Sequence, residues 1–219
     1  MVSDLTVDAM ALDGVIKTVA RFRAYENAVG RVPAGGGEAF AEACDVADED
    51  AVARLFNSVA GQFGRLDLLV NNAGTLAPGA IDEHAVADWD RMTATNMRGA
   101  FLCTRGALRM MKPRRGGRII NIGRSPPVGS APTTPPVARA SSRWRGLPCA
   151  RSTAARHLLQ HCSSRHTLSE ITDLPDFPEP RMDPREIARV VTLIAALPAD
   201  TTMLEGVILP VGQPFLGRG

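Results

Sequence analysis

The sequence predicts an α/β fold of three layers around a mostly parallel sheet, and two patterns predict it. Short continuous apolar runs, typical of strands covered on both faces, alternate with segments whose apolar residues recur at helical spacing. The resulting order of strand, helix, strand, helix and strand favours parallel strands joined by right-handed crossovers. Because 219 residues suffice for one domain with a proper core, we expect a single domain over 1–219.

Regular elements fill the middle of the chain, from Glu38 to Arg124. Strands are expected where apolar runs end in polar or small residues, and helices where apolar residues recur at i, i+3, i+4 and i+7. In chain order, the expected elements are strand 41–47, helix 48–64, strand 66–74, helix 87–112 and strand 117–123. Acidic residues in the first turn of helix 48–64, and Pro113 after helix 87–112, support these limits.

The closing part of the chain shows the same pattern. Asp183 is suited to cap a helix over 182–198, and Pro184 fits its first turn. An apolar stripe that includes Ile187 should cover the sheet, and a last strand is expected over 204–212.

The two flanking regions are less regular. The N-terminal one indicates a single strand, 14–20, and a short helix, 24–32. Between Arg124 and Leu174, Pro, Ser and Arg recur without a sustained period, and only a helix over 150–161 is expected.

Charge distribution bears on nucleic-acid binding. Between Arg91 and Ser169 the chain has no Asp or Glu but fourteen Arg and one Lys, a bias typical of nucleic-acid-binding proteins. The same stretch contains only two aromatic residues, Phe101 and Trp144, too few for a surface that stacks bases. We therefore expect no nucleic-acid partner.

Membrane segments and metal sites are not expected either. No apolar run approaches the roughly 20 residues that span a bilayer, and the first residues carry acids rather than a basic region. The four cysteines show no CxxC pair, and His157 and His161 lack the glutamate of a metalloprotease motif. We expect a cytoplasmic protein with free thiols, no membrane and no metal.

Polar and small residues stand where the expected strands end, and parallel α/β sheets bind ligands beyond the carboxyl ends of their strands. Asp45 and Val46 close the first of these strands, and the Asn-Asn-Ala-Gly run at 71–74 closes the next. The small residues let a flat ligand approach the backbone, while Asn71 is suited to fix neighbouring strand ends by hydrogen bonds.

The motifs CDVAD, LDLLVNNAG, TNMRGAF and GRIINI occur in an order and spacing that resembles the short-chain dehydrogenase/reductase family, particularly its 3-oxoacyl-reductase-like members. The resemblance covers 38–124 well, and 182–212 as a closing helix and strand. It implies a Rossmann-like fold, a nicotinamide cofactor (NADP or NAD) and a small-molecule substrate with a carbonyl or secondary alcohol group. It also implies a homodimer or homotetramer, because long helices pack between subunits in that family.

The resemblance further implies roles for individual residues. Asp45 and Val46 would hold the adenine, and the NNAG backbone would line the adenosine and ribose. Arg21 would receive a 2′-phosphate or, alternatively, begin a solvated helix. Asn96 would anchor a proton-relay water through its main chain, and Ser125 stands beside the position of the carbonyl-binding serine. The expected site is Asn96 and Ser125 for catalysis, with Arg21, Asp45, Val46, Asn71, Ala73, Gly74 and Ile122 for the cofactor.

The family's glycine-rich phosphate-binding turn, TGxxxGxG, is missing from the sequence. The GGG at 35–37 reads as an ordinary loop. Segment 14–37 resembles the family's second strand and the helix after it, so 1–37 is interpreted as a divergent or truncated start without the first strand. Loss of that strand would expose two strand edges, and we therefore expect marginal stability.

The catalytic Tyr and Lys of the family are missing as well. Tyr25, the only tyrosine of the chain, is far from the expected position. Thr133 and Val137 stand in the Tyr and Lys positions, and Arg124 stands in the Ser position. Threonine is no acid near neutral pH and valine carries no charge, so the proton-transfer groups of the family are absent.

Two explanations fit the irregular segment 125–175, and the sequence leaves both open. One is divergence into a non-catalytic protein. The other is a reading-frame slip, because GC-rich codons read out of frame give Arg, Pro, Ala and Ser with few acids. We expect an NAD(P)-dependent oxidoreductase that is impaired or inactive as written; the alternative is a non-catalytic pseudoenzyme that acts as a binding or assembly partner.

Overall fold

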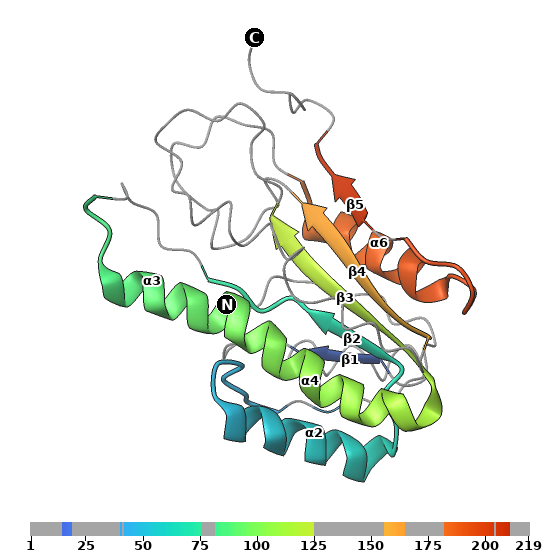
Figure 1. Cartoon of the computed structure of the whole chain (residues 1–219). Coiled ribbons are helices and arrows are strands. Elements are labelled where there is room, and N and C mark those ends of the chain that lie inside the picture. The colour runs from blue at the N-terminus through green and yellow to red at the C-terminus, as the bar shows by residue number, and fades with distance from the viewer. Residues whose placement is uncertain are drawn as a thin grey trace.

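A single parallel sheet organises the part of the chain that the computed structural model describes. The described residues are 15–18, 40, 42–75, 82–124, 156–164, 182–203 and 205–210. Their strands are β1 (Val15–Thr18), β2 (Leu68–Asn71), β3 (Gly116–Arg124), β4 (Arg156–Ser164) and β5 (Glu205–Ile208). These five strands pair in chain order, and every described pairing is parallel (Figure 1). The expected α/β fold with a mostly parallel sheet is confirmed.

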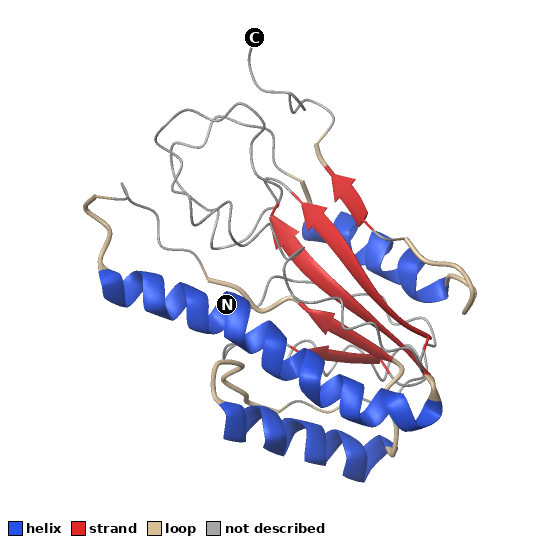
Figure 2. Ribbon diagram, viewed as in Figure 1, coloured by secondary structure: helices blue, strands red, loops and turns tan. Residues whose placement is uncertain are grey.

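Helices cover both faces of this sheet. They are α2 (Glu49–Phe63), α3 (Val86–Thr93), the π-helix η2 (Ala94–Gly99), α4 (Ala100–Met111), the 3-10 helix η3 (Lys112–Arg114) and α6 (Pro184–Ala196). Helices α2 and α4 lie side by side on one face, whereas α6 lies on the other (Figure 2). None of the helices in the described ranges is long and apolar enough to cross a membrane.

The two helical layers bury alternate residues of the same strands. Leu69 and Ile119 belong to the apolar cluster under α2 and α4. Leu68, Val70 and Ile120 belong to the cluster under α6. The continuous apolar run of β2 therefore has a simple cause, since successive side chains of a strand point to opposite faces and both faces are covered.

Local capping chemistry sets the ends of α2, close to the limits 48–64 that the sequence predicts. The Asp48 carboxylate accepts a hydrogen bond from the N–H of Ala51 at 2.8 Å, and this bond holds the pKa of Asp48 below its usual value. At the other end, Gly64 adopts φ 65° and donates its N–H to the carbonyl of Ala60. Asp183 caps α6 in the same way, accepting from the N–H of Arg185 at 2.8 Å.

The strand expected over 41–47 is wrong for the residues of this run that the structure describes. They form a loop and a turn, in which the N–H of Asp48 donates to the carbonyl of Asp45 at 3.0 Å. The N–H of Ala47 also donates to the Asp45 carboxylate at 3.0 Å. Asp45 thus accepts hydrogen bonds from the backbone N–H groups of Ala47 and Asp48, which need no partner on a neighbouring strand. The apolar character of the run reflects the burial of Val46 in the core.

The helix expected over 150–161 is also wrong where it is described, because 156–161 belongs to β4. Strand β4 pairs with β3 along one edge and with β5 along the other. The sheet thus satisfies its backbone groups, and this tertiary pairing outweighs a weak helical pattern. The short helix expected over 24–32 lies outside the described residues.

Strand β1 confirms part of the strand expected over 14–20, and its position bears on the expected strand edges. Val15 to Thr18 pair directly with Leu68 to Asn71 of β2. In the common doubly wound order, 3-2-1-4-5-6, this place belongs to the first strand of the fold. The pairing removes the exposed edge that we expected on this side of β2.

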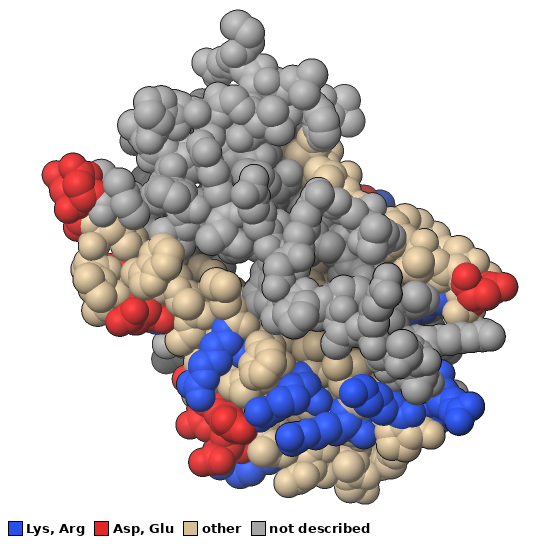
Figure 3. Space-filling model, in the orientation of Figure 1, with Lys and Arg blue, Asp and Glu red and all other residues tan. Residues whose placement is uncertain are grey.

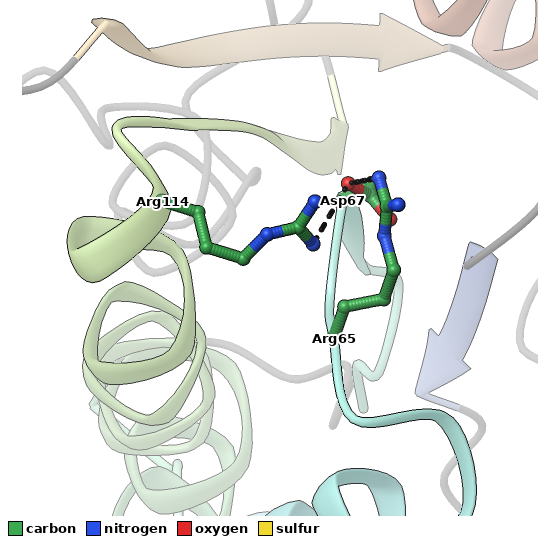
Figure 4. Close-up of polar contacts among 3 residues, drawn as sticks. All are labelled: Arg65, Asp67 and Arg114. Atoms are coloured by element: carbon green, nitrogen blue, oxygen red, sulfur yellow. Dashed lines mark hydrogen bonds and ion pairs between the residues drawn. The ribbon is translucent and has the colours of Figure 1, made fainter.

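Arginines connect the amino-terminal edge of the sheet to the helices. Asp67, directly before β2, binds Arg65 through two hydrogen bonds of 2.6 and 2.5 Å and lies 3.6 Å from Nη1 of Arg114 (Figure 4). Arg118 donates to the carbonyls of Leu197 and Pro198 at 2.5 and 2.6 Å, just after α6. A cation at the carboxyl end of a helix is favourable, so Arg118 stabilises the end of α6 against the sheet.

A glycine substitution tests how closely α2 and α4 approach. A Cβ at Gly106 would lie 2.6 Å from the ring of Phe56. Gly106→Ala should therefore lower the free energy of unfolding by about 1–3 kcal/mol, because the ring must move within a packed core. Gly61→Ala on α2 is the control: its Cβ meets nothing within 4 Å, and it should raise that free energy by about 0.5–1 kcal/mol. Urea unfolding followed by circular dichroism measures both, and stabilisation by Gly106→Ala would contradict the close contact.

Candidate functional site

A buried pair of amides joins the carboxyl-terminal halves of β2 and β3. Asn71 and Asn121 occupy the same register position, and Nδ2 of Asn71 donates to Oδ1 of Asn121 at 2.8 Å. The same Nδ2 donates to Oγ1 of Thr104 on α4 at 3.1 Å. Both asparagines are almost fully buried. The expectation that Asn71 fixes neighbouring strand ends is confirmed, and Thr104 extends the network to the covering helix.

Asn96 holds the segment that follows β2. Its Oδ1 accepts from the N–H of Thr75 at 2.8 Å, and its Nδ2 donates to the carbonyl of Thr75 at 2.9 Å. Gly74 lies against the same side chain, because a Cβ there would be 3.6 Å from Oδ1 of Asn96. The side-chain amide of Asn96 is thus committed to the backbone after β2.

The turn that carries Asn96 is a π-helix. Helices α3, η2 and α4 follow one another without a break, and Ala94–Gly99 is the π segment. The sequence predicts one uninterrupted helix over 87–112, so the π turn is a feature that the pattern did not reveal. Its weak local signal is the presence of Asn96 and Gly99, both poor helix formers, within one turn. Single π turns inside α-helices are frequent at functional sites.

Loop 44–47 packs against the same π turn. Val46 is only 2% exposed, and a Cβ at Gly99 would lie 2.6 Å from its Cγ2, so this approach requires glycine. Asp45 is exposed, and one of its carboxylate oxygens accepts from the N–H of Ala47. Nη1 of Arg98 donates to the carbonyl of Ala47 at 2.8 Å.

The predicted site residues therefore meet along one line of contacts. Loop 44–47 contacts η2, and η2 contacts the segment after β2, where Ala73 packs on the core. This line contains the predicted residues Asp45, Val46, Asn71, Ala73, Gly74 and Asn96. It also contains residues that the sequence did not single out, namely Thr75, Arg98, Gly99, Thr104 and Asn121.

The other predicted site residues do not join this line. Ile122 is partly buried against the apolar cluster under α6, so its described contacts are those of a core residue. Arg21 and Ser125 lie outside the described residues.

Two buried thiols belong to this region: Cys44 in loop 44–47 and Cys103 on α4. Burial, with a further contribution from the nearby carboxylates of Asp45 and Glu42, raises the pKa of the Cys44 thiol from 9.0 to about 11. Burial raises the pKa of the Cys103 thiol on α4 to about 12. Thiols with such pKa values are poor nucleophiles and poor metal ligands near neutral pH. Within the described ranges, no group of three or more His, Cys, Asp or Glu side chains is placed to hold a metal ion.

Comparison with known sequences relates more than half of the chain to one family. A family model described as short chain dehydrogenase matches residues 5–130. A 3-oxoacyl-[acyl-carrier-protein] reductase of Synechocystis is 34% identical over 118 residues, which are 54% of this chain and 48% of that protein. D-threitol dehydrogenase of Mycolicibacterium smegmatis is 40% identical over 80 residues, 36% of this chain and 31% of that protein. The matched part thus spans half or less of these relatives.

Solved structures resemble the fold over a longer stretch. A short-chain dehydrogenase/reductase from Serratia marcescens superposes with a TM-score of 0.77 and 27% identity, covering 92% of this chain and 86% of that one. A metagenomic short-chain oxidoreductase in complex with NADP gives a TM-score of 0.66 and 26% identity, covering 85% of this chain and 80% of that one.

A double-mutant cycle tests the amide pair. Asn71→Leu and Asn121→Leu should each lower the free energy of unfolding by about 1–3 kcal/mol, because each leaves a buried amide short of a partner. The double variant should cost at least about 1 kcal/mol less than the sum, since no half-satisfied amide remains. Asn71→Leu combined with Arg189→Gln, on the exposed surface of α6, is the control and should be additive. Additivity of the two asparagine variants, measured by urea unfolding, would show that the bond contributes nothing.

Proposed function

The chain belongs to the short chain dehydrogenase family, and from that premise we propose that it binds the adenosine half of a nicotinamide cofactor, NADP or NAD. The observation that supports this proposal best is the convergence of loop 44–47, the segment after β2 and the π turn η2. The single domain over 1–219 and a cytoplasmic location, suited to the free thiols Cys44 and Cys103, are part of the same proposal.

The residues at this convergence fit the adenosine. Asp45 is exposed and uses one carboxylate oxygen in its own turn, which leaves the other to accept from an amino group of the adenine. Val46 is buried against Gly99 and so anchors the loop that presents Asp45. Gly74 is exposed, and the atom nearest to a Cβ there is Oδ1 of Asn96 at 3.6 Å, so a flat group can approach this backbone.

The proposed reaction class is oxidoreduction of a carbonyl or secondary alcohol, carried out weakly or not at all. The cofactor, when bound, supplies the hydride acceptor or donor. In this chain the main chain of Asn96 would hold a water, and Ser125 would bind the substrate oxygen beside Arg124. With Thr133 and Val137 in the Tyr and Lys positions, the sequence places no proton donor of suitable pKa there. Activity is therefore proposed to be far below that of a complete family member.

Assembly with a second copy is the other proposed property, and the surface of the long helix favours it. Val86, Trp89, Met97 and Phe101 are 73%, 41%, 48% and 45% exposed along α3, η2 and α4. Such a row of large apolar side chains is typical of an interface. We propose a homodimer formed through this row, or a homotetramer of two such pairs; a pseudoenzyme that serves only as a binding partner would use the same row.

The charges on the same helix favour an antiparallel pair. Asp88 and Asp90 lie near its beginning, whereas Arg105 and Arg109 lie near its end, and Lys and Arg side chains gather over α4 (Figure 3). A two-fold axis brings the same patch of both copies together, so the acidic end of each helix would face the basic end of the other.

Ligand titration tests the proposed cofactor site. AMP should bind to the chain, and NADP should bind little more tightly, because the glycine-rich phosphate loop is missing. Asp45→Ala should weaken AMP binding about tenfold, the equivalent of one hydrogen bond to a charged group. Isothermal titration calorimetry measures both, with Asp200→Ala on an exposed turn as the control. Rapid NADPH oxidation with a ketone, abolished by Asn96→Ala, would contradict the proposed loss of activity.

Light scattering after size-exclusion chromatography tests the proposed dimer. Phe101→Glu should convert the assembly to monomer, because a carboxylate of each copy would be buried in the interface. Leu193→Glu on α6 is the matched control: Leu193 is 54% exposed, lies outside the row, and its substitution should leave the mass unchanged. A native chain that is monomeric at every concentration tested would rule out this interface.

A further inference from the structure

Arg98 joins two segments that are far apart in the sequence. Its Nη1 donates to the carbonyl of Ala47 at 2.8 Å, a contact between positions separated by 51 residues. That carbonyl belongs to the turn that also presents Asp45 and Val46. A guanidinium on η2 therefore holds the backbone of the loop that the proposed function assigns to the adenine.

The π turn gives Arg98 its place. Asn96, two residues earlier, holds Thr75 after β2, and Gly99, the next residue, packs against Val46. Successive residues of one turn thus contact both walls of the proposed site. Because α3, η2 and α4 form one continuous helix, this helix sets the distance between the two walls.

Charge strengthens the tie between Arg98 and the loop. The pKa of Asp48 is held low mainly by the N–H of Ala51, with Arg98 adding to the effect. The pKa of Glu49 is held low mainly by its hydrogen bond to Arg105, with Arg98 again contributing. Arg98 is therefore attracted by two carboxylates at the start of α2, and the Arg105–Glu49 pair, at 2.5 Å, fixes the same end of that helix.

We infer that Arg98 is a positioning residue for the adenine: it holds loop 44–47 in the conformation that receives the base, without touching the ligand itself. The inference rests on the proposed function, since it assumes that an adenine binds at this loop. Without Arg98, the loop keeps the turn made by Asp45 and the packing of Val46 on Gly99, but it loses its hydrogen bond to η2. The free-energy cost of ordering the loop is then incurred when the ligand binds, which lowers the affinity for the adenine.

The first measurement is hydrogen exchange of the peptide 42–48 in the ligand-free chain. Arg98→Gln should speed its exchange, Arg98→Lys should restore most of the protection, and Arg189→Gln, at an exposed arginine on α6, should change nothing. The melting temperatures of the variants should remain close to that of the native chain, because Arg98 is exposed. Equal exchange in Arg98→Gln and Arg189→Gln would overturn the inference.

The second measurement compares adenosine with AMP. Arg98→Gln should weaken both by the same factor, about fivefold to tenfold, because the residue acts through the loop. A loss for AMP alone would overturn the inference, because it would show that Arg98 binds the phosphate directly. If the native chain binds neither ligand, the proposed cofactor site is refuted and the positioning role with it, even where exchange of 42–48 responds to Arg98→Gln. If both ligands bind and neither responds to Arg98→Gln, the positioning role alone fails.

Discussion

The hydrogen bond between Asn71 and Asn121 is the contact on which the geometry of the candidate site depends. Two amides buried between strands are costly unless they satisfy each other, so the bond fixes the register of β2 and β3 near their carboxyl ends. Thr104 adds the covering helix to the same network. The segment after β2 consequently leaves the sheet at a defined point, and the side chain of Asn96 binds its backbone at Thr75.

Much of this fold is predictable from local sequence, because the responsible interactions are local. The limits of α2 follow from Asp48 and Gly64, and the run of β2 follows from burial on both faces. The turn at Asp45 and the strand β4 are different cases. The turn depends on the Asp45 side chain, which accepts from the backbone two residues later, and an apolar pattern does not reveal such a bond. Strand β4 depends on pairing with two strands that are distant in the sequence.

The candidate site was predictable to a similar degree. Residues at strand ends are identifiable once the strands are known, as for Asn71 and Gly74. Their partners are not, because Thr104 and Arg98 stand in a helix among residues of the same kinds, and only the packing of α4 selects them. The arginines also show why an arginine-rich composition is a poor guide to nucleic-acid binding. The stretch without acidic residues begins at Arg91, yet Arg98, Arg105 and Arg118 within it make specific contacts inside the protein.

The two parts of the proposed site lie in different segments of the chain. The contacts proposed to fit adenosine are made by loop 44–47, the end of β2 and η2, all of which lie within the residues matched by the family model. Thr133 and Val137, which the resemblance aligns with the catalytic Tyr and Lys, follow in a segment of different composition. The same continuous helix supplies both the inner wall of the proposed adenosine site and the outer apolar row. Asn96 is turned toward Thr75 while the adjacent Met97 is 48% exposed. Selection on either surface would therefore preserve this helix, and with it the shape of the proposed adenosine site.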